Sequence, residues 1–275
     1  MNKTIYHDSL NPFLDISPSK SKISPMNKLP AITAILLCDL MISTPSHAKK
    51  AGKEMVKIPS GCFQMGTTEV HQYFDHEQND RERPAHKVCL DSFYIDKYEA
   101  SQKKFKELMD RNPSKLFNDD WPADHVRFQD AETYCSLQGK RLPTEAEWEY
   151  ASRAGSKEGN PYGKNFNDHV WHAGNSVRTP HPAGSKKPNA WGVHDMLGSV
   201  WEWVSDWYSP SYYQNSPKNN PQGPKDRRSH HVIRGGSWAD DESLIRVGSR
   251  HPGMADATES FLVGVRCAQS IKGGK

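Results

Sequence analysis

The segment at residues 191–208 most constrains how this chain can fold. It reads WGVHDMLGSVWEWVSDWY and holds four of the eight tryptophans of the chain. Large aromatic rings supply much of the buried area of a protein core, whereas carboxylates are rarely buried without a partner. Because Asp195, Glu202 and Asp206 are interleaved with the rings, the segment predicts a buried element whose acids are paired with cations or bound to a metal.

Four positions in this segment have the spacing expected of ligands for a hard cation. The side chains of Asp195 and Glu202 and the backbone carbonyls of Gly198 and Val200 could converge on one ion. Calcium takes about six to eight oxygen ligands of these kinds, so the pattern suits calcium. The alternative from the residues alone is that the glycines form turns, the tryptophans form core and the acids pair with arginines.

The N-terminal part of the chain resembles an export signal preceded by an extra segment. Residues 26–48 combine a short basic start, an apolar run over 29–43 and small residues before Lys49, which is the layout of a secretory signal peptide. Met26 is then a candidate initiator, and residues 1–25 a non-native extension. An apolar run of ~15 residues is too short to span a bilayer. We therefore expect a periplasmic or secreted protein with no membrane span after signal cleavage.

Removal of the signal would leave four cysteines, Cys62, Cys89, Cys135 and Cys267. An even number in an oxidising compartment predicts two disulfides, which can pair in three ways. We favour Cys62 with Cys89, which would join two apolar stretches across a polar excursion, and Cys135 with Cys267, which would tie the middle of the chain to its end. A zinc site is the alternative, but no Cys-x-x-Cys pair supports it.

The length of residues 49–275 predicts one domain, and their charge gives no indication of nucleic-acid binding. The formal charge of the chain is +3, and the first 48 residues carry four Lys and three Asp, so the mature protein keeps +2. This near-neutral balance gives no case for a nucleic-acid partner. Abundant Gly, Pro and Trp indicate much loop around a small regular core rather than disorder.

Local patterns predict short strands and three helices. Strands are expected within 55–65 and over 86–98, where apolar and polar residues alternate. One helix is expected to follow Ser101 and a second to cover 130–138. The clearest start is at 144–147, where Thr144 caps and Glu147 closes a capping box; this third helix should pack against the tryptophan-rich segment.

The remaining regions are predicted mostly as loop. Residues 155–188 are rich in Gly, Pro, Asn and His, and His169 and His172 within them are interpreted as loop residues rather than metal ligands. A closing strand is expected at 261–268.

Six sequence blocks follow one another in a fixed order. They are GCFQMG (61–66), FYIDKYEAS (93–101), KRLPTEAEWEYASRAG (140–155), PNAWGVHDMLGSVWEWVSDWY (188–208), RGGSW (234–238) and GVRCA (264–268). Together they resemble the formylglycine-generating enzyme family, also called the sulfatase-modifying-factor domain, from about Met55 to Ala268. The resemblance implies an α+β fold related to C-type lectins, poor in regular secondary structure and often stabilised by calcium.

The resemblance also implies roles for single residues. The family's calcium site in the tryptophan-rich block corresponds to Asp195, Gly198, Val200 and Glu202, the same four that the spacing selects, which places calcium above the ion-pair alternative. The pairing of Cys135 with Cys267 matches a disulfide of the family. Ser199 stands where the family usually has Asn, a change that does not touch the four ligands.

The chain departs from the family at the catalytic position. In the oxidase, two cysteines after the GGS-aromatic motif bind copper(I) and use oxygen to convert a sulfatase cysteine to formylglycine. Here Asp240 stands where the first cysteine would be, and the second has no counterpart. Copper(I) requires soft thiolate ligands. We therefore expect neither copper nor formylglycine generation.

Two functions are consistent with this departure. The first is an accessory, binding or maturation factor that recognises an exported protein, a peptide or a glycan. The alternative is a periplasmic oxidoreductase-type maturation enzyme acting on a secreted protein or a small molecule. The ligand pocket is expected around five residues that follow the GGS motif: Ser237, Trp238, Asp240, Arg246 and Arg250.

Overall fold

The computed structural model describes residues 54–69, 80–253 and 262–271. The expected extension (1–25) and signal peptide (26–48) lie outside these residues. No helix in the described part of the chain is long and apolar enough to cross a membrane.

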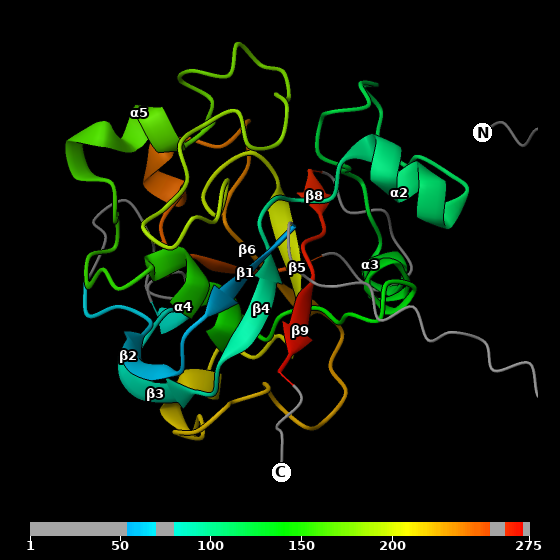
Figure 1. The fold of residues 1–275 in the computed structure, drawn as a ribbon. Coiled ribbons are helices and arrows are strands. Elements are labelled where there is room, and N and C mark those ends of the chain that lie inside the picture. Colours follow the sequence, from blue (N-terminus) through cyan, green and yellow to red (C-terminus); the bar gives the residue numbers. More distant parts are fainter. Residues whose placement is uncertain (1–53, 70–79, 254–261, 272–275) are drawn as a thin grey trace, which may run out of the picture. The chain divides into compact units, whose positions relative to one another are not determined.

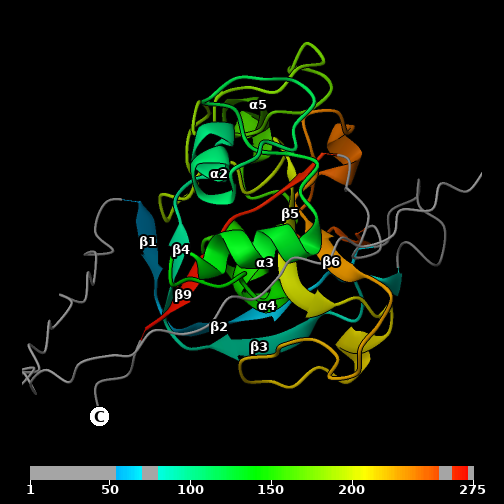
Figure 2. The same ribbon diagram turned by 90° about the vertical axis from the view of Figure 1, so that its right-hand side faces the viewer.

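Short strands form three small sheets (Figure 1). The strands of each sheet, in spatial order, are β1 (Met55–Ile58), β4 (Phe93–Asp96) and β9 (Ala268–Ser270); β2 (Gly61–Met65) and β3 (His86–Leu90); and β7 (Arg250–Pro252), β6 (His231–Arg234), β5 (Trp201–Trp207) and β8 (Val263–Gly264). All pairings are antiparallel except β5 with β8. The two-stranded sheet lies at the end of the fold opposite α2 (Gln102–Met109) and α5 (Phe166–His169), as Figure 2 shows.

The other helical elements of the described residues are α3 (Phe128–Ser136), α4 (Glu145–Arg153) and three short 3-10 turns, η1 (Gly163–Asn165), η2 (Tyr212–Gln214) and η3 (Glu242–Leu244). The capping box predicted for α4 is confirmed, since Thr144 Oγ1 accepts from Glu147 N and the Glu147 carboxylate accepts from Thr144 N. The cap at Ser101 is also confirmed. The second helix begins at Phe128 instead of residue 130.

Two predicted strands are each divided in two. The expected strand 86–98 breaks at residues 91–92, and its halves, β3 and β4, join different sheets. The prediction of one closing strand over 261–268 is likewise wrong, because the chain forms two short strands there, β8 and β9. Between β8 and β9, the carbonyls of Val265 and Cys267 accept hydrogen bonds from Ala100 N and Asp96 N. The chain therefore leaves β5 at this point and crosses to β4.

The tryptophan-rich segment lies in the core, as predicted. Alternate residues of β5 point to opposite faces of the strand and enter two different clusters. Trp203 packs with residues of α2 and α3, including Phe105 and Phe128. Val204 belongs to the cluster that contains Trp148 of α4. Since Trp148 Nε1 also donates to Glu202 at 2.7 Å, the predicted packing of α4 against this segment is confirmed.

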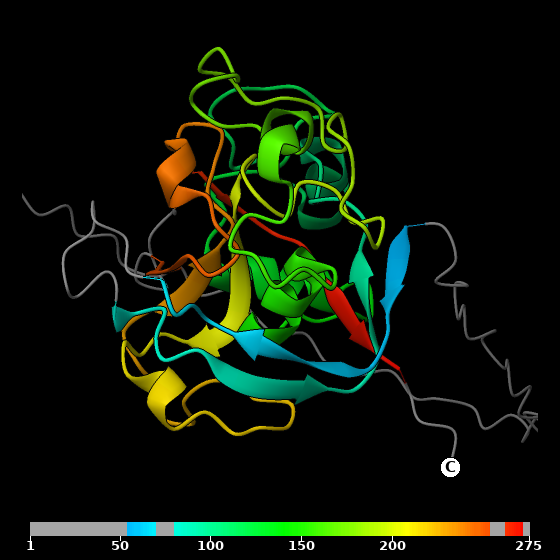
Figure 3. The same ribbon diagram turned by 90° about the vertical axis from the view of Figure 1, so that its left-hand side faces the viewer.

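Both favoured disulfides are confirmed. Cys62 and Cys89 are bonded and lie directly opposite each other in the β2–β3 ladder. The outer side of β3 is covered in turn by the segment around 218–220, because Cys89 N donates to Lys218 O and Cys89 O accepts from Asn220 N; this segment is coloured yellow beneath β3 in Figure 3. Cys135 of α3 is bonded to Cys267, 132 residues further along the chain.

Candidate functional site

Three carboxylates are buried around the turn that leads into β5. Glu99, Asp195 and Glu202 are 3%, 4% and 1% exposed. One guanidinium, that of the fully buried Arg266, bonds both oxygens of Glu202, with Nη2 2.7 Å from Oε1 and Nε 3.0 Å from Oε2. Trp148 Nε1 donates to the same carboxylate. Glu202 therefore has the ion-pair role that the alternative interpretation assigned to the acids.

The turn before β5 is built from left-handed residues. Gly198 has φ 75° and Ser199 has φ 57°. A Cβ on Gly198 would lie 2.1 Å from the carbonyl oxygen of Trp171, so only glycine fits there. Ser199 Oγ donates to Glu99 Oε2 at 2.9 Å, and Val200 N donates to Oε1 at 3.2 Å. Glu99 thus holds the turn on which the predicted metal ligands are placed.

Asp195 has one oxygen that the protein does not satisfy. Its Oδ2 accepts from Gly184 N at 2.6 Å, whereas Oδ1 is buried without a hydrogen-bond partner among the described residues. Burial raises the pKa of Asp195 to about 6. Burial, together with the carboxylates of Asp195 and Glu202, raises the pKa of Glu99 well above its usual value. A buried carboxylate oxygen without a partner is costly unless a proton or a cation lies beside it.

The unpartnered oxygen of Asp195 is compatible with a hard cation that is held partly by the backbone. Among the described residues, no three His, Cys, Asp or Glu side chains form a metal-binding group by themselves. A cation near Asp195 Oδ1 would therefore depend on carbonyl oxygens, and those of Gly198 and Val200 are the ones that the sequence selects. This chemistry suits calcium better than a transition metal, because every available donor is an oxygen.

Asp240, which the sequence resemblance places where the family has its first catalytic cysteine, has a structural role. Its Oδ2 accepts three hydrogen bonds, from Ser237 N at 2.8 Å, Ser237 Oγ at 2.7 Å and Trp201 Nε1 at 2.8 Å. The carboxylate thereby closes the GGSW turn and joins it to β5. All four cysteines of the described residues are in disulfides, so none of them offers a free thiolate.

Of the five expected pocket residues, Ser237, Trp238 and Asp240 share one turn, whereas Arg246 and Arg250 are engaged in ion pairs. Arg250 is 1% exposed, and its guanidinium bonds Glu145 with Nε 2.6 Å from Oε1 and Nη2 2.9 Å from Oε2. Ser237 is fully buried. Arg246 is the one member of the five that lines a cavity of about 700 Å³, where it forms a two-pronged ion pair with Glu82.

That cavity was not predicted from the sequence. It opens beside β2 and the end of α4, and Phe63, Tyr150 and Trp191 form an aromatic wall. Residues from widely separated segments contribute to it, so no local pattern signals it. Tyr150 does belong to the block EYASRAG, which could have suggested that the end of α4 faces a site.

A buried network of ion pairs between arginines and glutamates lies next to this cavity. Arg153 bonds Glu149, Glu149 bonds Arg234, and Arg234 and Arg250 both bond Glu145. All five side chains are almost completely removed from solvent. Because each charge has an opposite partner, this network of ion pairs fixes α4 against the end of β6 without leaving an unpaired ion.

Comparison with known proteins agrees with the sequence blocks. The model of the sulfatase-modifying factor enzyme 1-like domain matches residues 42–271. The formylglycine-generating enzyme of Bos taurus is 29% identical, over 82% of this chain and 77% of that protein. The enzyme of the same name from Streptomyces coelicolor is also 29% identical, over 82% and 91%. Hercynine oxygenase of Mycolicibacterium smegmatis is 28% identical, over 86% and 65%.

Solved structures share the fold. PvdO from Pseudomonas aeruginosa superposes with a TM-score of 0.67 at 27% identity, over 79% of this chain and 94% of that chain. Treponema denticola variable protein 1 gives a TM-score of 0.68 at 23% identity, over 79% and 95%, which shows the fold alone. The predicted α+β, loop-rich architecture is confirmed. The chain belongs to the sulfatase-modifying factor enzyme 1-like family, which is the formylglycine-generating enzyme family that its six blocks resemble.

Proposed function

We propose that this protein is an exported accessory or maturation factor that binds its target and does not generate formylglycine. The observation that carries the proposal is the set of hydrogen bonds that the Asp240 carboxylate accepts. A carboxylate is a poor ligand for copper(I), and the oxygen that faces the turn already accepts three hydrogen bonds from Ser237 and Trp201. The position that carries the first thiolate in the oxidase therefore holds the fold here.

The export part of the proposal is supported by the cysteines. Two disulfides, Cys62–Cys89 and Cys135–Cys267, use every cysteine of the described residues. Such bonds persist in oxidising compartments and are rare in the cytosol. The mature protein would begin after residue 48 and reside in the periplasm or outside the cell.

Calcium is proposed as a structural ion at the turn before β5. Asp195 through Oδ1 and the carbonyls of Gly198 and Val200 would hold it, together with Glu202, whose carboxylate would be shared with Arg266. Its positive charge would neutralise the carboxylate of Asp195, whose Oδ1 has no partner, and would stiffen the turn. The support for this ion is the buried, unpartnered Oδ1 of Asp195 and the excess of three carboxylates over one arginine at this place.

An oxidoreductase-type maturation enzyme is the second candidate. It is favoured by one comparison, since a relative named hercynine oxygenase matches over 86% of this chain. Such an activity would need a redox centre of its own, and the two candidates therefore differ in the metal that accompanies the protein.

Two measurements test the proposal together. The mature protein, purified from an oxidising compartment, is analysed for calcium, copper, iron and zinc against protein concentration. It is then incubated with copper(I), oxygen and a sulfatase-derived cysteine peptide, and aldehyde is trapped with a hydrazide. The formylglycine-generating enzyme of Streptomyces coelicolor is the positive control. We expect calcium near one ion per chain and no aldehyde. Aldehyde formation would refute the proposal, and bound iron or copper would favour the oxidoreductase.

A further inference from the structure

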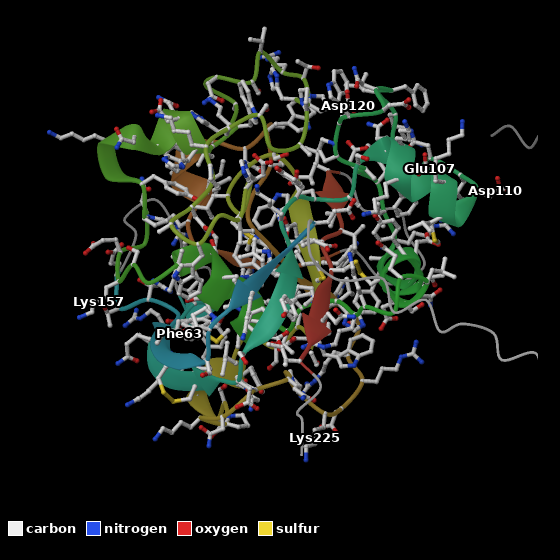
Figure 4. The ribbon with its side chains drawn as sticks, in the orientation of Figure 1. Phe63, Glu107, Asp110, Asp120, Lys157 and Lys225 are labelled. Atoms are coloured by element: carbon white, nitrogen blue, oxygen red, sulfur yellow. A yellow bond between two sulfur atoms is a disulfide. The ribbon has the colours of Figure 1, made fainter. Side chains whose placement is uncertain are left out.

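The cavity beside β2 has the size and the lining of a small-molecule site. Its volume of about 700 Å³ falls inside the range of about 300–1,000 Å³ that is common for ligand pockets. Its walls come from β2, β3, the end of α4 and the loop that follows α4. Figure 4 shows two of the lining side chains, Phe63 on β2 and Lys157 on that loop, at the same side of the molecule.

One wall of the cavity is a fixed group of three aromatic rings. The ring centroids of Phe63 and Tyr150 are 5.0 Å apart, and those of Tyr150 and Trp191 are 4.9 Å apart with a nearly perpendicular arrangement. Tyr150 is held by packing and is 7% exposed. A Cβ on Gly61 would lie 2.3 Å from the Tyr150 hydroxyl, so glycine makes room for this ring. Rings fixed in this way lose little conformational freedom when a ligand binds.

The charges at the cavity favour an anion. Arg153 and Arg246 line the cavity, but Glu149 and Glu82 neutralise them with bonds of 2.8 Å and 2.7 Å. Lys87 and Lys157 are exposed and have no ion-pair partner among the described residues. Glu69 is the one acid of the lining. Two flexible ammonium groups against one carboxylate give the mouth of the cavity a positive balance, and lysines bind carboxylate or phosphate as point charges.

The rest of the rim is suited to hydroxyl groups. Gln64 lies opposite Lys87 in the β2–β3 ladder and is exposed. The Thr67 and Ser156 hydroxyl oxygens accept bonds from nearby backbone amides, which leaves their protons to be donated. Neutral donors and acceptors therefore surround the aromatic wall.

We propose that this cavity binds an acidic sugar, either as a single residue or as the end of a short oligosaccharide. The apolar face of the sugar ring would lie on the wall of Phe63, Tyr150 and Trp191, its hydroxyls would meet the neutral rim, and its acid group would lie between Lys87 and Lys157. The tilted and perpendicular arrangement of the rings offers one open face rather than a slot between two parallel rings. This arrangement favours a sugar over a flat aromatic acid. The inference deepens the proposed binding function and rests on it.

The test is a titration of the full mature protein by calorimetry and by tryptophan fluorescence, which Trp191 should report. The probes are glucuronosyl-glucose, the neutral disaccharide cellobiose, 4-hydroxybenzoate and inorganic phosphate. We expect the acidic disaccharide to bind at least about tenfold more tightly than each of the others, with an affinity that falls as salt is raised, because one or two charge-assisted contacts distinguish it.

Variants locate the site. The change of both Lys87→Gln and Lys157→Gln should weaken binding of the acidic disaccharide about tenfold and leave cellobiose unaffected. Phe63→Ala should weaken both sugars. Lys225→Gln is the matched control, since Lys225 is an exposed lysine that lines a different cavity and stands apart from Phe63 and Lys157 in Figure 4. Thermal melting confirms that each variant is folded.

Several outcomes would overturn the inference. These are equal binding of the acidic and neutral sugars, tighter binding of 4-hydroxybenzoate or phosphate, an equal effect of the control lysine, or no binding by the folded protein. None of them would produce aldehyde or a redox metal, so a failure here is distinct from a failure of the proposed function.

Discussion

The Glu202–Arg266 pair offers a sharp test of how the site is held together. Arg266 is fully buried, bonds both oxygens of Glu202, and donates to the carbonyls of Asp96 at 3.0 Å and His194 at 2.8 Å. Replacement by methionine keeps the volume but removes the single guanidinium among three carboxylates. Breaking a buried pair from one side costs about 3–5 kcal/mol, because the remaining charge has no partner. We expect Arg266→Met to lower the free energy of unfolding by that amount.

Arg141 supplies the matched control. It also forms a two-pronged pair, with Glu147, at 2.6 Å and 2.7 Å. Its side chain is 38% exposed, however, so solvent screens the interaction and its loss should cost roughly 1 kcal/mol or less. Comparison of Arg141→Gln with Arg266→Met separates the effect of burial from the effect of pairing geometry.

The assay is equilibrium unfolding in urea at pH 7, with a calcium chelator present and disulfides intact. A double variant, Glu202→Gln with Arg266→Met, should recover part of the loss, since it removes the stranded carboxylate. If Arg266→Met were no more destabilising than Arg141→Gln, or if the double variant showed no recovery, the argument that Arg266 neutralises this acid cluster would be wrong.

Three further predictions concern pH, calcium and the disulfides. Burial raises the pKa of Asp206 to about 7, so between pH ~4 and ~7 the folded state retains a proton that the unfolded state has lost, and the stability of the parent protein falls as pH rises. In urea unfolding, the free energy of unfolding of Asp206→Asn should therefore rise relative to that of the parent protein across this interval and change no further above it. Calcium should raise the melting temperature of the parent protein and leave that of Asp195→Asn almost unchanged, and equal shifts in differential scanning fluorimetry would exclude Asp195 as a ligand. Loss of the Cys135–Cys267 bond, whose ends are 132 residues apart, should cost about 5 kcal/mol, and loss of the Cys62–Cys89 bond, whose ends are 27 residues apart, about 3.5 kcal/mol by loop-closure entropy. Denaturant midpoints of the paired Cys→Ser variants would contradict this if their order were reversed.

Features whose causes are local could be predicted from the sequence. The capping box of α4 involves Thr144 and Glu147, three residues apart, and it forms as expected. The tryptophan-rich segment is buried because transfer of its large apolar rings out of water is favourable. The even number of cysteines predicted two disulfides; the polar stretch between Cys62 and Cys89 favoured the first pair, and the family resemblance supported Cys135 with Cys267.

Features that depend on distant partners could not be predicted in the same way. The sequence places Asp195 and Glu202 near the turn before β5, but it gives no sign that Glu99, about 100 residues earlier in the chain, holds that turn. Arg250 was expected at a pocket because it follows the GGSW motif, yet it bonds Glu145, 105 residues away. Long side chains reach partners that no periodicity reveals, and the cavity behind Tyr150 is likewise made from several separate segments.

Asp240 joins two segments of the fold at the position where the sequence resemblance predicts a cysteine in the oxidase. The carboxylate accepts three hydrogen bonds and joins the GGSW turn to Trp201 of β5. These hydrogen bonds hold the GGSW turn against β5. Because Trp201 begins the strand that also carries Glu202, Asp240 and the predicted calcium turn are joined through β5. A chain with this arrangement is suited to present a stable binding surface, and that is the function we propose for it.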